Sequence, residues 1–166
     1  MMGSTHLLAG VAVGCGIVTV VPDMSFSYEL AVVGLSSLGS LFPDIDHGNS
    51  KISKKVPLIS KLVRLFNGHR GLFHTPFFYA ILAAGFYFWQ QPLSTEWMAC
   101  FVAFFAGIAS HIVLDACTKQ GLPLLYPFSK KNYHLIPFPM KTNSIGEYMV
   151  RICIVCVVIG TLWIKA

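Results

Sequence analysis

Histidine and aspartate side chains recur beside the ends of the hydrophobic segments of this sequence. His111 and Asp115 stand four residues apart in an apolar run, so on a helix they project from one face, one turn from each other. This spacing suits two ligands of one metal ion, or a ligand and the carboxylate that orients it. The other candidates at such ends are His6, Asp44, Asp46, His47, His69, His74 and Glu147.

The composition indicates that the solvent of this chain is largely lipid. Apolar residues make up 55% of the 166 residues and charged residues only 11%, whereas about 25% of an ordinary soluble domain is charged. A carboxylate or imidazole at membrane depth is costly unless it is paired or binds a metal. A chain with so few charges therefore favours a site at which these groups neutralise one another or bind a cation. The length predicts a single domain over residues 1–166.

Five apolar segments predict an all-α, polytopic membrane bundle of about five membrane-embedded helices. Only the fourth reaches the ~20 residues that cross a bilayer without help, and helical flanks from Gly3 and Ile145 would lengthen the first and the fifth. Glycine and serine residues in the second segment suit close helix–helix approach. A short interfacial helix is predicted within residues 57–66, with Lys61 and Arg64 on its polar face. The apolar segments are 7–21, 28–42, 77–89, 97–116 and 150–164.

The distribution of basic residues predicts the orientation in the membrane. With five spans, the N-terminus, the linkers 48–71 and 117–144 and the start of the fifth span share one side. Of the twelve Lys and Arg residues, six lie in the first linker, four in the second, one is Arg151, and only Lys165 lies opposite. The positive-inside rule then places the N-terminus in the cytoplasm and the protein in the bacterial inner (cytoplasmic) membrane. The same topology brings the candidate site residues to the cytoplasmic side.

The remaining charged and sulfur-containing residues receive simpler interpretations. The net charge of +5 does not indicate nucleic-acid binding, because the basic residues lie in linkers and not on a helix face that could enter a groove. Cys153 and Cys156 are interpreted as small apolar residues of a span. Lys54 is interpreted as an anchor to lipid headgroups, and His134 lies outside the site pattern.

The candidate ligands indicate a divalent metal. Mixed imidazole and carboxylate ligands suit Zn, Mn or Fe and exclude neither Ni nor Co; we expect Zn or Mn. The candidates outnumber the three or four ligands of one catalytic zinc, so the sequence allows two ions. Two-metal sites hold their ions about 3.5–4 Å apart, generate hydroxide and stabilise a leaving oxygen, which is the chemistry of phosphoester hydrolysis. Arg70, beside His69, could grip a substrate phosphate.

The ordered motifs T-H-L-L-A-G, L-F-P-D-I-D-H, G-H-R-G-L-F-H-T-P, S-H-I-V-L-D-A-x-T and G-x-P-L-L-Y-P resemble the YdjM-like family. Its members are bacterial inner-membrane proteins described as metal-dependent hydrolases, some under the SOS repressor LexA. The resemblance runs from His6 to about Phe128, with a weaker echo at Glu147, and it supplies no substrate. It implies metal-site roles for His6, Asp44, Asp46, His47, His69, His74, His111 and Asp115.

These observations predict a metal-dependent hydrolase at the cytoplasmic interface, acting on a phosphoester or lipid-linked substrate through metal-activated water. The expected partner is membrane lipid, with an anionic phospholipid or an isoprenoid phosphate as substrate and no nucleic acid. The alternative is a non-catalytic metal-binding membrane protein: a transporter, a sensor or a scaffold. A transporter needs polar residues at the bilayer midplane, which the first, third and fifth segments almost lack. The predicted metal ligands are His6, Asp44, His47, His74, His111 and Asp115, and the predicted catalytic residues are Asp46, His69, Arg70 and Glu147.

Overall fold

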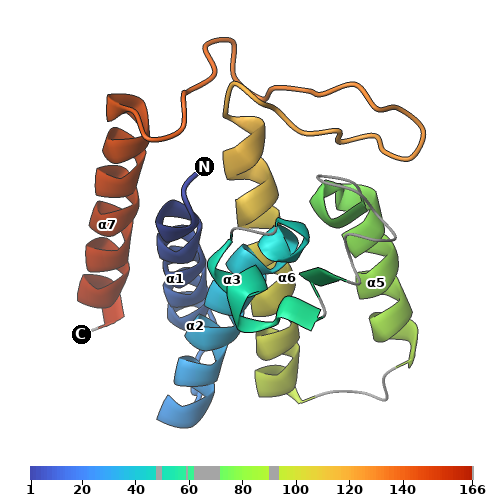
Figure 1. Ribbon diagram of the computed structural model, residues 1–166. Helices are drawn as coiled ribbons and strands as arrows, with labels where there is room; N and C mark the ends of the chain where they lie inside the picture. Colours follow the sequence, from blue (N-terminus) through green and yellow to red (C-terminus); the bar gives the residue numbers. More distant parts are fainter. Residues whose placement is uncertain (48–49, 59, 62–71, 90–93, 166) are drawn as a thin grey trace.

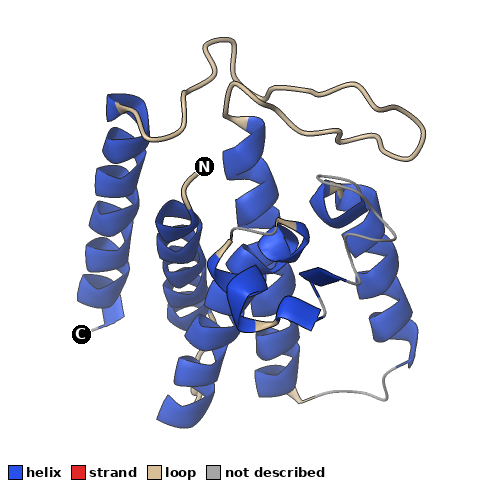
Figure 2. Cartoon of the chain, in the orientation of Figure 1, coloured by secondary structure: helices blue, strands red, loops and turns tan. Residues whose placement is uncertain are grey.

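The computed structural model is a bundle of helices joined by loops (Figures 1 and 2). It describes residues 1–47, 50–58, 60–61, 72–89 and 94–165. Within these residues the only strand-like pairings are two isolated bridges in the loop 117–144. The elements are α1 (Gly3–Val20), α2 (Phe26–Leu41), the 3-10 turn η1 (Phe42–Asp46), α3 (Lys51–Lys55), η2 (Leu72–His74), α5 (Pro76–Trp89), α6 (Thr95–Ala116) and α7 (Ile145–Lys165).

The five longest helices coincide with the five predicted apolar segments, which confirms the all-α membrane bundle. α1 and α7 begin at Gly3 and Ile145, the helical flanks that the sequence required for spans of sufficient length. By length and composition, α1, α6 and α7 can each cross a membrane, whereas α2 and α5 are shorter, at 16 and 14 residues. Most of the interfacial helix predicted within residues 57–66 lies outside the described residues, at residue 59 and residues 62–66.

Small residues let α2 lie directly against α6 at the centre of the bundle. A Cβ atom at Gly107 would stand 2.1 Å from the backbone oxygen of Ser36, and one at Gly39 would stand 2.1 Å from that of Phe104. The two backbones therefore touch, which confirms the close approach predicted from the small residues of the second segment. This contact brings the end of α2 to the last turns of α6, where the candidate ligands lie.

The start of α1 and the start of α7 meet at the same end of the bundle. Glu147, in the first turn of α7, accepts hydrogen bonds from the Met2 backbone nitrogen at 2.7 Å and the Thr5 hydroxyl at 2.5 Å. Glu147 is also the only buried residue along α7. The rest of α7 exposes apolar side chains, as expected of a helix whose other faces meet lipid. Polar contacts at its first turn therefore help to attach this helix to α1.

Candidate metal centre

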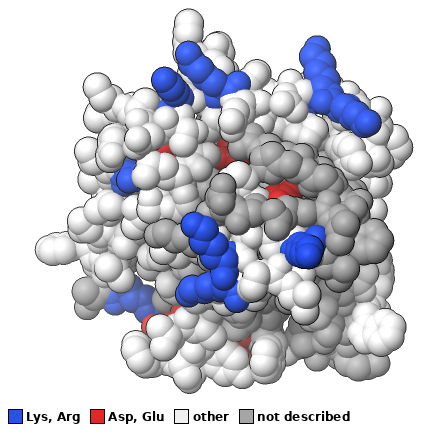
Figure 3. Space-filling view, in the orientation of Figure 1, with Lys and Arg blue, Asp and Glu red and all other residues white. Residues whose placement is uncertain are grey.

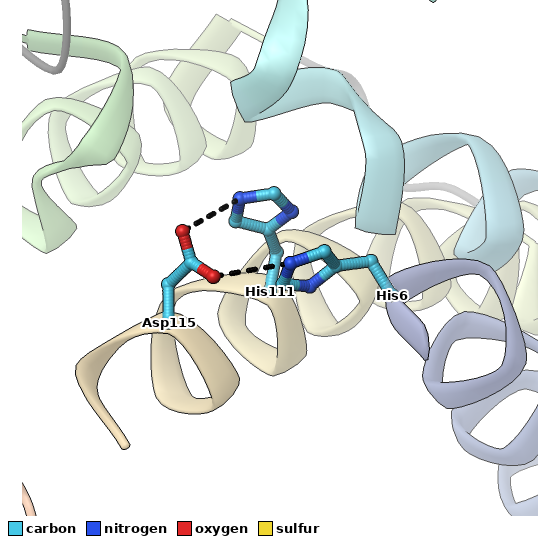
Figure 4. Close-up of side chains that lie close together, drawn as sticks. All are labelled: His6, His111 and Asp115. Carbon is cyan, nitrogen blue, oxygen red and sulfur yellow. Dashed lines mark ion pairs between the residues drawn. The ribbon is translucent and has the colours of Figure 1, made fainter. Parts of the chain in front are cut away.

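Three side chains from α1 and α6 lie close together (Figure 4). His6 comes from the first turns of α1, and His111 and Asp115 come from one face of α6. His6 Nε2 lies 3.1 Å from Asp115 Oδ1, and His111 Nε2 lies 3.8 Å from Asp115 Oδ2. One ligand atom from each residue falls within 4.8 Å of the others, and all three residues are buried. Such an arrangement can surround a single cation.

Two buried imidazole nitrogens have no hydrogen-bond partner among the described residues. They are His6 Nδ1 and His111 Nε2, whereas His6 Nε2 forms the ion pair with Asp115. An unsatisfied polar group in a buried site costs about 1–3 kcal/mol, so native structures rarely keep several together. A metal ion bound by His111 Nε2 would remove that cost for this nitrogen. The donor set therefore fits a divalent metal.

A second group of ligands shares His111. Asp44 from η1 and His74 from η2 join His111 with ligand atoms within 4.8 Å of one another, and Asp44 Oδ1 lies 3.9 Å from His111 Nε2. Because one imidazole nitrogen binds one ion at a time, the two groups cannot both be filled through this atom. The described side chains thus fit one ion as they stand, and a second ion needs ligands besides His111.

Hydrogen bonds fix the orientation of two of the imidazoles. His111 Nδ1 lies 2.7 Å from the backbone oxygen of Ser40, so this nitrogen donates and Nε2 is left for a metal. His74 Nδ1 lies 3.1 Å from Asp46 Oδ2 in a buried pair. A carboxylate that holds the far side of a ligating histidine sets its tautomer and raises its basicity. Through this contact, Asp46 can orient the imidazole of His74.

The charges around the centre are mixed. The ammonium group of Met1 forms an ion pair with Asp115 Oδ1. Burial raises the pKa of the Asp44 carboxyl above its ordinary value, and the nearby imidazoles of His6 and His74 partly offset that rise. A bound cation would favour the charged carboxylate in the same way.

The structure brings together five of the six predicted ligands: His6, Asp44, His74, His111 and Asp115. His47 is exposed at the end of η1 and belongs to neither group. His69 and Arg70 lie outside the described residues.

Glu147 lies close to the centre but contacts the backbone of α1. Besides its bonds from Met2 and Thr5, its carboxylate accepts a hydrogen bond from the Asn143 backbone nitrogen at 2.6 Å. Since these bonds fix the turn that carries His6, Glu147 is placed to position that ligand. Its predicted catalytic role stays a prediction.

Two residues of the site escaped the sequence analysis. Ser40 acts through its backbone oxygen, which the residue type cannot reveal. Thr5 receives a hydrogen bond from Arg151 Nε at 2.8 Å and donates one to Glu147, so it joins α7 to α1. Its place directly before His6 in the first motif was the available signal.

The chain matches the model of one protein family and is similar to several known proteins. The family model of the YdjM inner membrane protein matches residues 1–166. The uncharacterized protein YvsG of Bacillus subtilis (strain 168) is 33% identical over 153 residues, which cover 90% of this chain and 87% of YvsG. The inner membrane proteins YdjM of Escherichia coli (strain K12) and Shigella flexneri are each 31% identical over 123 residues, which cover 71% of this chain and 60% of theirs. No solved structure matches the chain significantly.

Proposed function

The chain belongs to the family of YdjM inner membrane proteins, and we propose that its histidine–aspartate cluster is a metal centre that hydrolyses a phosphoester or lipid-linked substrate. The observation that carries this proposal is the convergence of the buried imidazoles of His6 and His111 on the buried carboxylate of Asp115. Zn or Mn is the metal that these ligands suit best. When bound, such an ion lowers the pKa of a coordinated water and supplies a hydroxide nucleophile.

The unequal exposure of the candidate ligands supports access of water and substrate to the centre from one side. The side chain of Asp44 is 21% exposed, whereas those of His111 and Asp115 are at most 3% exposed. Water and substrate would therefore reach the centre past Asp44, and His6, His111 and Asp115 would form its closed wall. An open position beside a partly exposed ligand is what a catalytic metal site requires.

The cytoplasmic orientation is part of the proposal. A centre at the starts of α1 and α7 and the end of α6 lies near one membrane surface, on the side of most basic residues. A periplasmic reporter fused after residue 166 is expected to be active, and a cytoplasmic reporter at the same place to be inactive. Fusions after residue 130, in the loop 117–144, should give the opposite pattern. A cytoplasmic signal at both places would overturn the five-span orientation.

A non-catalytic metal centre is the second candidate, because the cluster joins α1, η1, η2 and α6 and could serve as a structural staple. If the metal centre is purely structural, we expect that removing the metal with a chelator lowers the melting temperature strongly and that no substrate is turned over. Transcriptional control by LexA, implied by the family resemblance, stays an expectation.

Hydrolysis is tested directly with the full chain purified in detergent. The protein is stripped of metal, reloaded with Zn or Mn, and incubated with phospholipids and an isoprenoid phosphate while released phosphate or headgroup is measured. We expect release only in the reloaded protein and not in the His111→Ala variant. Release that is equal in both proteins would come from a contaminant and contradict the proposal, as would none with any substrate in metal-loaded protein.

A further inference from the structure

A pocket lies in the loop that follows α6. It has a volume of about 220 Å³ and is lined by Lys119, Gln120, Met140, Lys141 and Thr142. The two halves of the loop are joined there, since the Lys119 backbone nitrogen donates to the Met140 oxygen at 2.9 Å. The neighbouring Thr118 donates from its hydroxyl to the Asp115 backbone oxygen at 2.7 Å. The pocket is therefore tied to the turn of α6 that carries a candidate metal ligand.

The charge of the pocket is not balanced within the described part of the chain. Both lysines are exposed, and no carboxylate of the described residues forms an ion pair with either of them. Gln120 and Thr142 add an amide and a hydroxyl as hydrogen-bond donors. Two ammonium groups and further donors around one hollow form a site for a phosphate-like anion.

The same loop exposes apolar side chains beside its lysines. Phe128 is 82% exposed and Phe138 is 88% exposed, and Leu125 and Leu135 are also exposed. In Figure 3, some of the basic side chains lie along the top edge, where this loop lies in Figure 1, and others lie in the middle and at the lower left of the same face. Exposed aromatic and aliphatic residues next to lysines are typical of a segment that enters the interface of a bilayer with anionic lipids. These exposed residues favour a lipid surface as the source of the anion.

We propose that the pocket between Lys119 and Lys141 binds the phosphate group of an anionic membrane lipid and holds it beside the metal centre. This inference goes beyond the proposed hydrolysis, because binding at the pocket needs no metal. Combined with that function, it assigns the headgroup site of an anionic lipid substrate.

The test measures binding of short-chain phosphatidic acid to the metal-stripped full chain in nanodiscs of neutral phosphatidylcholine. Lys119→Gln/Lys141→Gln is expected to weaken binding by about 10-fold or more, since each lysine supplies a charge-assisted hydrogen bond. Lys130→Gln/Lys131→Gln is the matched control. It removes the same charge from the same loop at two exposed residues outside the pocket, and we expect less than about 2-fold weakening there.

A parallel titration with inorganic phosphate separates the two sources of the anion. Tighter binding of the lipid, with inorganic phosphate competing, supports the site and its lipid. Equal affinity for both ligands would overturn the lipid assignment, and equal weakening in both double variants would overturn the pocket. Metal content is expected to be unchanged in the pocket variant, so a protein that binds lipid but never hydrolyses it contradicts the proposed function alone. Single variants Lys119→Gln and Lys141→Gln replace the double variant if its yield in membranes falls.

Discussion

Replacing His111 with alanine is expected to abolish stable metal binding, because this imidazole belongs to both groups of candidate ligands. The loss should exceed the ~10–100-fold that follows removal of an outer partner of a ligand. His111 is fully buried and its Nδ1 is fixed by the Ser40 oxygen, so no exposed neighbour can take its place without moving α6. The measurement is a competition titration of the purified protein with a fluorescent zinc chelator.

His134→Ala is the matched control for this substitution. His134 is also a histidine whose Nδ1 lies 3.0 Å from a backbone oxygen, that of Thr118, but it is exposed and belongs to neither ligand group. We expect its metal affinity to equal that of the unmodified protein. Full metal affinity in His111→Ala together with loss in His134→Ala would show that another constellation binds the metal.

Gly107→Ala is expected to produce the second large effect, a loss of about 1–3 kcal/mol in the free energy of unfolding. The new methyl group would stand 2.1 Å from the Ser36 oxygen, so α2 and α6 would have to separate. Gly107 lies one turn before His111 on α6, and Ser36 lies one turn before Ser40 on α2. Separation would therefore also lengthen the bond that orients His111 and weaken metal binding. Thermal unfolding of the metal-free protein, followed by zinc titration, measures both effects.

Gly34→Ala is the control, since a Cβ atom there would meet nothing within 4 Å. Alanine has the higher helix propensity, so the stability should stay the same or rise slightly. Equal destabilisation by the two substitutions would mean that the α2–α6 contact does not determine the stability of this bundle.

The sequence predicted the helices and the proximity of most candidate ligands because both follow from strong local signals. Long apolar runs specify spans, and alternating direction brings their polar ends to one side. The four-residue spacing of His111 and Asp115 gave the central pair of the site. Ligands from α1, η1 and η2 could be grouped with it because each stands at the end of an apolar segment.

Other features could not be predicted because they depend on distances across the bundle. His47 stands one residue after Asp46 but is exposed, since the chain leaves the 3-10 turn at that point. Glu147 was predicted to be catalytic from its place at the start of the fifth span, and that role stays a prediction. Its partners, the backbone of Met2 and the hydroxyl of Thr5, are revealed only by the packing of α7 on α1. The lysine pocket needs two residues separated along the loop to meet, and neither lies in a motif.

Elemental analysis of the purified full-length chain, after incubation with Zn and Mn and removal of unbound metal, tests the metal centre most directly. We expect about one tightly bound ion per chain through His6, His111 and Asp115, or two if further ligands complete a second position. Chelation should remove the metal, and His111→Ala should retain none. A folded wild-type protein that holds no more of either metal than the His111→Ala variant would contradict a metal centre at these residues.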